Sequence, residues 1–325
     1  LSGTPFTFGL TFLPTDVLGP VVGPTRGPAS DLVDACIALK ASFAFVAARE
    51  PWAEDATTLL AEAGVAPFWV VGGPLWPVIE ARGIAEGLRA TLTDPEHVGR
   101  EIDDRLGTLA DEVARGARAG ARAVVLAEDL AGSEGPLVAP DFAIAELVPR
   151  YGRFVEVAAS LGMPSVLHSD GDIRPLLPAV VKAGFVAVHA GGGLARDAFI
   201  RLFDSARETG PVVIGGLLTR DLANAALAES IGTRIGLLAH GGGLHVADDG
   251  GITPASYRFA SVMPAIFFAL PVNERCARAG FVGFLQAEPE WVVELLLLSQ
   301  PCAHRCRPAV WVGTGNPGFL AGSTA

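Results

Sequence analysis

The sequence is short of cysteine, of positive charge and of long apolar runs, and each shortage excludes a class of protein. Four cysteines in 325 residues are too few for a disulfide framework, which favours a reducing compartment. Lysine and arginine total 24 against 35 acidic residues, and the net charge of −11 argues against a nucleic-acid partner. No apolar segment reaches the roughly 18 residues that a membrane span requires. The first residues lack the regions of a signal peptide, so we expect a cytoplasmic protein.

Hydrophobic residues are abundant, at 50% of the chain, and they alternate between strand-like and helix-like patterns. Short apolar runs predict eight strands, at residues 5–13, 42–47, 67–71, 122–127, 164–167, 185–189, 211–214 and 233–239. Amphipathic or capped segments between them predict helices, and no linker divides the chain. Such alternation indicates a parallel sheet that is covered by helices.

Two architectures fit eight strand–helix units in a chain of this length. A doubly wound open sheet is one, but no G-x-G-x-x-G motif follows the first strand. We therefore predict the other, an α/β fold with a single (β/α)8 TIM barrel. The barrel domain would span residues 1–325, with a tail from about residue 280 that the pattern does not place.

In such a barrel, functional residues lie at the carboxyl ends of the strands. The strand at 164–167 is followed by His168, Asp170 and Asp172, with Gly171 allowing a tight turn among them. Three side chains that can bind a metal therefore meet where a strand gives way to a helix. The alternative is that they only cap the helix and satisfy the turn.

Histidines and acidic residues gather at the same predicted edge of the barrel, and together they suit zinc. We predict that His168 and Asp170 are metal ligands. The third ligand would come from the segment after the last predicted strand, which contains His245, Asp248 and Asp249. That glycine-rich segment could instead be a solvated turn.

Other residues at this edge are candidates for catalysis or cofactor binding. Glu128 and Asp129 end the fourth predicted strand, where burial can raise a carboxyl pKa and suit acid–base chemistry, and Asp172 is a further catalytic candidate. Four positions at or just beyond predicted strand ends are candidate cofactor-binding residues: His189, Gly215, Gly216 and His240. The glycines after His189 precede a predicted helix and could bind an anion through backbone N–H groups.

These same stretches resemble the uroporphyrinogen decarboxylase superfamily, which includes zinc-dependent, corrinoid-linked methyltransferases. The resemblance extends over about residues 110–265 and rests on residues 128–132, 135–140, 149–151, 168–172, 214–216, 240–243 and 253–254. It implies a (β/α)8 barrel, in agreement with the strand count.

One departure from the superfamily pattern argues against its decarboxylases, and a second changes the zinc ligands of its methyltransferase branch. The decarboxylases carry an N-terminal Arg-Gln-Ala-Gly-Arg signature, which is absent before Pro28. The methyltransferases hold zinc through a His-x-Cys pair and a later cysteine. Here the pair aligns with His168 and Asp170, and the later cysteine falls near Asp248 or Asp249. The resemblance thus implies a zinc site of nitrogen and oxygen ligands. It also implies methyl transfer from a small methylated O-, N- or S-compound to a corrinoid (cobalamin) on a partner protein.

Two other functions stay open at this point. One is a metal-free lyase that decarboxylates a small carboxylic acid, with Asp129 and His168 handling protons. The other is a non-catalytic barrel that binds a tetrapyrrole or corrinoid. Cys302 and Cys306 fit ordinary terminal residues better than a zinc site, and the apolar residues 291–298 suit either packing on the barrel or a homodimer contact.

Overall fold

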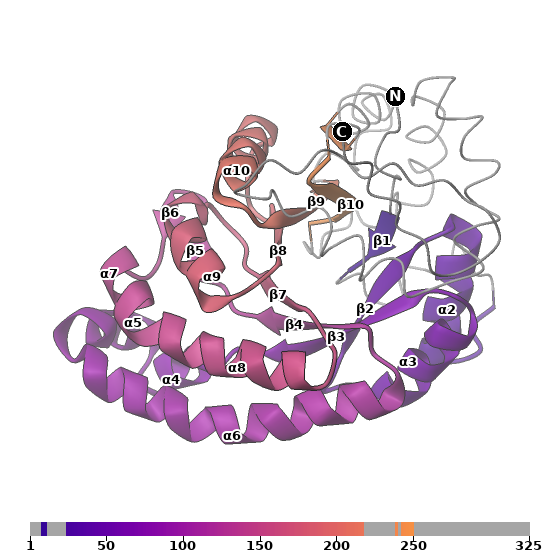
Figure 1. The fold of residues 1–325 in the computed structure, drawn as a ribbon, viewed down its shortest axis with the longest axis horizontal. Helices are drawn as coiled ribbons and strands as arrows, with labels where there is room; N and C mark the ends of the chain where they lie inside the picture. The colour runs from indigo at the N-terminus through magenta and orange to yellow at the C-terminus, as the bar shows by residue number, and fades with distance from the viewer. Residues whose placement is uncertain (1–7, 12–23, 218–237, 240–241, 250–325) are drawn as a thin grey trace, which may run out of the picture.

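The predicted barrel is present. A computed structural model of the chain describes residues 8–11, 24–217, 238–239 and 242–249 (Figure 1). Eight parallel strands close on one another in the order β1-β10-β9-β8-β7-β4-β3-β2. They are β1 (Phe8–Leu10), β2 (Phe43–Ala47), β3 (Ala66–Gly72), β4 (Ala123–Ala127), β7 (Ser165–His168), β8 (Ala187–Ala190), β9 (Val212–Leu217) and β10 (Leu244–Asp248).

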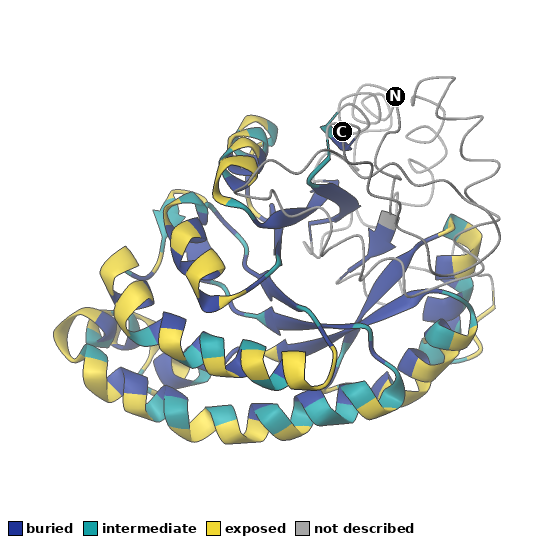
Figure 2. Ribbon diagram, in the orientation of Figure 1, coloured by how far each residue is buried: buried dark blue, intermediate teal, exposed yellow. Residues whose placement is uncertain are grey.

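Helices cover the outside of the barrel, with exposed faces outward and buried faces against the strands (Figure 2). They are α2 (Pro28–Leu39), α3 (Ala53–Glu62), α4 (Leu75–Ala81), α5 (Ile84–Thr93), α6 (Pro95–Ala119), α7 (Pro140–Phe142), α8 (Val148–Ser160), α9 (Leu177–Ala183) and α10 (Arg196–Thr209). A π-helical segment (Ala143–Leu147) joins α7 to α8, and a 3-10 turn (Arg174–Leu176) precedes α9. Among the described residues, none of these helices has the length and apolar character to cross a membrane.

The barrel interior is packed with side chains from alternate strand positions. Phe43, Phe45 and Phe68 stack there, with ring centroids 5.1 Å apart for Phe43–Phe68 and 5.8 Å apart for Phe45–Phe68. A second apolar layer lies between the strands and the helices and includes Trp69. Because both faces of each strand are buried, the strands are continuous apolar runs in the sequence. The aromatic cluster fills the barrel, so chemistry is confined to its ends.

The position of the last barrel strand corrects one prediction. We expected the eighth strand at residues 233–239, but Leu238 and Ala239 are helical, and residues 233–237 lie outside the described residues. The strand that closes the barrel is β10, in the segment predicted to be a loop. Its His245 and Asp248 obscured the apolar pattern. Both are buried, and the Asp248 carboxylate accepts a hydrogen bond from the Thr11 N–H at 2.8 Å.

A small hairpin after β4 was not predicted, and it shapes the carboxyl end of the barrel. It consists of β5 (Ala131–Gly132) and β6 (Gly135–Pro136), paired antiparallel. The loop after β7 packs against it: the Asp172 N–H donates to the Gly132 carbonyl at 2.8 Å. Gly171 has a φ of +79°, and a Cβ there would lie 2.5 Å from two carbonyl oxygens of the hairpin. Only glycine fits this close approach.

Candidate metal site

Three side chains converge at the carboxyl ends of β4 and β7. Asp129, His168 and Asp170 each offer a ligand atom, and these atoms lie within 4.8 Å of one another. His168 Nε2 is 3.6 Å from Asp129 Oδ1, which also accepts a hydrogen bond from the Asp170 N–H at 2.9 Å. The grouping follows from strand register, because Ala127 pairs with His168 and Asp129 is two residues farther along. His168 is buried, whereas the Asp129 side chain is 47% exposed, so the cluster has a buried and an open side.

Asp170 is the least satisfied member of the cluster. Its Oδ1 is buried and accepts no hydrogen bond among the described residues. Burial raises the pKa of Asp170 to about 7, and the charges of Asp129 and Asp249 add to this rise. A buried carboxylate oxygen without a donor costs free energy, and a cation at this point would offset that cost.

His168 is joined to a second buried histidine. Its Nδ1 lies 2.7 Å from Nδ1 of His189, and Nε2 of His189 lies 2.9 Å from the Asp248 carbonyl oxygen. Burial lowers the pKa of His168 well below its ordinary value, and the neighbouring His189 lowers it further. Burial also lowers the pKa of His189. Both rings are therefore neutral at pH 7, and the His168–Asp129 contact is not an ion pair.

The loops around the cluster hold its members in place. Ser169 Oγ accepts from the Leu130 N–H and donates to the Asp170 carbonyl, both at 2.9 Å. Trp76 Nε1 donates to the Asp129 carbonyl at 2.7 Å. The Gly171 N–H donates to the Gly192 carbonyl at 2.9 Å, which ties the loop after β7 to the loop after β8. Hydrogen bonds of this kind orient metal ligands before a metal arrives.

One imidazole and two carboxylates form a donor set that suits zinc. A catalytic zinc takes three protein ligands and keeps one position open, and the half-exposed Asp129 lies on the open side. The unsatisfied Asp170 oxygen is compatible with a cation at the same place. The residues of the cluster therefore fit a divalent metal: His168 and Asp170, which we predicted as ligands, lie beside Asp129, which we predicted as a catalytic residue. Metal binding by these residues stays a prediction.

The structure separates Glu128 from the cluster. The Glu128 carboxylate is buried and accepts hydrogen bonds from the Leu75 N–H at 2.9 Å, the Trp76 N–H at 3.1 Å and the Tyr151 hydroxyl at 3.0 Å. These partners place it at the start of α4, and the neighbouring Trp76 side chain bonds Asp129. Burial raises the pKa of Glu128 to about 7. The raised pKa that we expected is present, but the described contacts of Glu128 fit a structural anchor.

Glu128 should make the stability of the protein depend on pH. Its folded-state pKa lies above the ordinary value of 4.5, so its stabilising effect is full below pH 4.5 and is lost as pH rises through 7. Glu128→Gln removes this titration. Between pH 5 and pH 8, the free energy of unfolding of the wild type should fall by about 2 to 3 kcal/mol more than that of the variant. Urea unfolding at both pH values measures the difference, and parallel pH dependence in the two proteins would contradict it.

The remaining acidic and histidine candidates have other surroundings. Asp172 forms an ion pair with Arg174 at 2.6 Å, and the Arg174 guanidinium lowers the pKa of Asp172, so this carboxyl is ionised at neutral pH. Asp249 is buried close enough to influence the pKa of Asp170. His245 is buried in β10, and burial lowers its pKa to about 4. Among the described residues, the structure groups Asp129 with His168 and Asp170, and it does not add His245, Asp248 or Asp249 to this group.

The glycine candidates have a local structural explanation. Gly215 and Gly216 lie within β9 with φ values of +144° and +97°, and a Cβ on Gly215 would lie 2.5 Å from the Ala190 carbonyl oxygen. Gly215 allows β8 and β9 to approach closely. The segment after His189 does not open a helix directly, because α10 begins at Arg196. His240 lies outside the described residues. Cofactor binding at these four positions stays a prediction.

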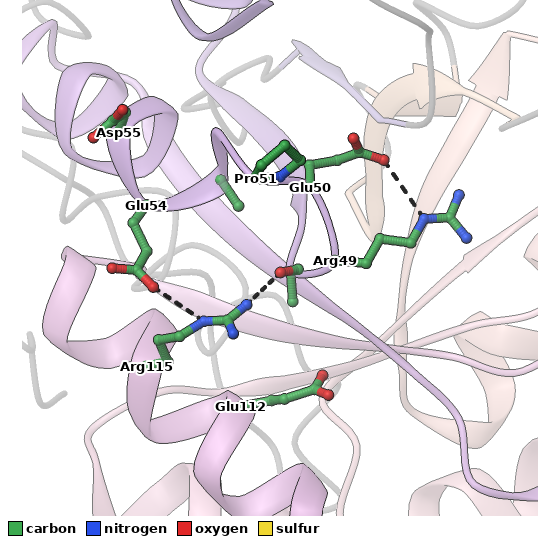
Figure 3. Close-up of a pocket in the computed structure, with 9 residues that line it drawn as sticks. Arg49, Glu50, Pro51, Glu54, Asp55, Glu112 and Arg115 are labelled. Atoms are coloured by element: carbon green, nitrogen blue, oxygen red, sulfur yellow. Dashed lines mark hydrogen bonds and ion pairs between the residues drawn. The ribbon is translucent and has the colours of Figure 1, made fainter.

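A polar hollow of about 450 Å³ follows β2, between α3 and α6 (Figure 3). Arg115 forms an ion pair with Glu54 at 3.1 Å and donates a hydrogen bond to the Ala48 carbonyl. Arg49 forms an ion pair with Glu50 at 3.6 Å. Both arginines of the hollow are thus paired with glutamates that also line it. None of its lining residues belongs to the Asp129 cluster, and we assign it no function.

Comparison with known proteins supports the fold but gives no close relative. No family model matches the sequence, and no curated protein matches it. A methyltransferase from Methanosarcina mazei has a similar structure, with a TM-score of 0.60 and 14% sequence identity, over 82% of this chain and 95% of that one. D-psicose 3-epimerase from Clostridium cellulolyticum H10, determined with D-tagatose, gives a TM-score of 0.50 at 9% identity, over 81% of this chain and 98% of that one.

These likenesses establish the fold alone, because barrels of this kind support many unrelated reactions. The chain therefore has a TIM-barrel fold that it shares with a methyltransferase and an epimerase. Membership of the uroporphyrinogen decarboxylase superfamily stays a prediction from the sequence.

Proposed function

We propose that the chain is a metal-dependent methyltransferase of the uroporphyrinogen decarboxylase superfamily. It would move a methyl group from a small methylated O-, N- or S-compound to a corrinoid on a partner protein. The observation that supports this most is the Asp129–His168–Asp170 group at the carboxyl end of the barrel, with an unsatisfied buried oxygen on Asp170. The barrel shared with the Methanosarcina methyltransferase is compatible with the proposal.

The reaction breaks the bond between the methyl carbon and its heteroatom, and both electrons stay on the heteroatom. The corrinoid would enter as the methyl-accepting substrate, with cobalt as Co(I) contributing the electron pair of the new bond to the methyl carbon. Zinc, when bound, would supply a Lewis acid that polarises the heteroatom and makes it a better leaving group. The displaced heteroatom would then take a proton from solvent water on the exposed side of the site.

The residues of the chain would bind the metal and exclude water from one side of it. His168 and Asp170 close the buried side, and Asp129 leaves the other side open to substrate. Asp172 is ion-paired and ionised, so its described state does not suit a proton donor. Glu128 acts indirectly in this scheme, by anchoring the start of α4, from which Trp76 bonds Asp129.

Metal content and methyl transfer test the proposal together. We expect about one zinc per chain in the wild type and in Asp141→Ala, which alters an exposed carboxylate, and much less than one in Asp170→Ala. Free cob(I)alamin is the acceptor probe, offered with methanol, methylamine, dimethyl sulfide or an aromatic methyl ether, and methylcobalamin formation is followed by absorbance. Absence of zinc from the wild type after incubation with zinc would contradict the proposal.

A lyase is the second candidate, and the pKa values favour it specifically. Asp170, whose pKa is raised to about 7, lies beside the neutral His168, and such a pair is suited to transfer protons at neutral pH. Decarboxylation of a small carboxylic acid by metal-free protein, lost in His168→Ala, would support the lyase over methyl transfer. Corrinoid binding without turnover, unchanged in His168→Ala, would instead support a non-catalytic binding protein.

A further inference from the structure

We infer that His189 is a positioning residue that fixes the tautomer of His168, so that His168 Nε2 carries no proton where it meets Asp129 and Asp170. This inference rests on the proposed function, because an unprotonated His168 Nε2 favours metal binding at the Asp129–His168–Asp170 cluster. It concerns a proton position in the protein itself, however, and can be tested without metal or substrate.

The Asp248 carbonyl oxygen can only accept a hydrogen bond. Since it lies 2.9 Å from His189 Nε2, that nitrogen must carry the proton and donate. A neutral imidazole has one N–H, so Nδ1 of His189 is an acceptor. His168 Nδ1, at 2.7 Å, must then donate to it. The single proton of neutral His168 is thus on Nδ1, and Nε2 keeps its lone pair.

Burial and packing keep this chain of hydrogen bonds in one arrangement. His189 is fully buried, and its ring lies 5.1 Å from the ring of Phe45. His168 and His189 are register partners on β7 and β8, so their rings are side by side at the same height in the barrel. Both rings are buried, and burial disfavours a charged imidazolium. The acidic groups near His189 are Asp248, Asp249 and Asp129.

Asp248, which ends this series of hydrogen bonds, is also fixed in position. The Asp248 carboxylate accepts from the Thr11 N–H at 2.8 Å and from the Thr11 hydroxyl, which links β10 to the residue after β1. The tautomer of His168 on β7 is therefore set by the main chain of β10, which is two strands from His189 on β8 and three strands from His168.

The tautomer decides whether His168 can bind a metal. A metal takes the unprotonated ring nitrogen, and the other nitrogen commonly donates to a supporting group. Neutral histidine in water favours the proton on Nε2, which would block the nitrogen that faces the cluster. His189 reverses that preference, so it contributes to the site without touching the metal.

The first test is the tautomer of His168 in metal-free protein, read from imidazole ¹⁵N chemical shifts and assigned with His168→Gln. We expect the proton on Nδ1 in the wild type. His189→Phe keeps a ring but removes both hydrogen bonds, and His168 should then revert to an Nε2 proton. His189→Gln should keep the wild-type tautomer, because its amide can donate to Asp248 and accept from His168. An Nε2 proton in the wild type, or an unchanged tautomer in His189→Phe, would overturn the inference.

The second test is zinc affinity, measured by competition with a chelator. His189→Phe should bind zinc about 10- to 100-fold more weakly, the range found for supporting residues, and His189→Gln should recover most of the loss. Phe45→Leu is the matched control: it removes packing on His189 and leaves the hydrogen bonds, so affinity should stay within about threefold. Equal losses in His189→Gln and His189→Phe would contradict the positioning role. If the wild type has the expected tautomer but binds no zinc, the proposed function fails and the inference about His168 stands.

Discussion

His168→Ala is expected to lower kcat/KM for methyl transfer at least about a thousandfold, because a loss of about 4 kcal/mol of transition-state stabilisation corresponds to that factor. In the proposed site, His168 is the one histidine of the Asp129–His168–Asp170 group that the structure describes. Zinc content should fall to the background of the measurement. Elemental analysis and the cob(I)alamin assay, run on the same preparation, measure both effects.

His97→Ala is the matched control for this variant. His97 lies on α6 with about half of its side chain exposed, and it does not belong to the metal group. This variant should keep about one zinc per chain and wild-type turnover. If His168→Ala retains both the zinc and the activity, the metal and the chemistry lie elsewhere in the chain.

Gly192→Ala is expected to have the second-largest effect, although Gly192 has no side chain in the site. A Cβ at this position would overlap the Asp170 carboxylate, so Asp170 must move or the loop must shift. The φ of Gly192 is outside the left-handed region, so the backbone itself accepts alanine. We expect zinc affinity to fall about 100-fold or more, with about 1 to 3 kcal/mol lost from the free energy of unfolding. Chelator competition and urea unfolding measure the two quantities.

The neighbouring Gly193 provides the control. Its φ is +74°, which alanine tolerates poorly, yet a Cβ there would meet no atom within 4 Å. Gly193→Ala should therefore cost about 1 to 2 kcal/mol of stability through backbone strain while zinc affinity stays near that of the wild type. If both variants bind zinc as the wild type does, Asp170 is not placed as a ligand.

The barrel was predictable because its strands are buried on both faces, and such strands are continuous apolar runs even in a single sequence. The same reasoning located His168 and Asp170 at a strand end, where the structure has them. It failed at β10, because a buried His245 and a buried Asp248 made a core strand resemble a loop. The hydrogen bonds that satisfy Asp248 come from Thr11, 237 residues away, and no local pattern reports them.

The division of roles between Glu128 and Asp129 could have been found from strand periodicity. Ala123 and Val125 face the barrel interior, so the same two-residue period places Asp129 on the inner side and Glu128 on the outer side. Treating the two carboxyls as equivalent ignored this alternation. The His168–His189 contact needs the register of β7 on β8, and the sequence alone does not supply it.

The most direct test of the account is zinc K-edge X-ray absorption on zinc-loaded wild-type protein. We predict a coordination shell of nitrogen and oxygen at about 2.0 to 2.2 Å, with the scattering of one imidazole and no sulfur. His168→Ala, loaded in the same way, should lose the imidazole contribution or the metal itself. A sulfur shell at about 2.3 Å would place the zinc on cysteines and contradict the assignment to Asp129, His168 and Asp170.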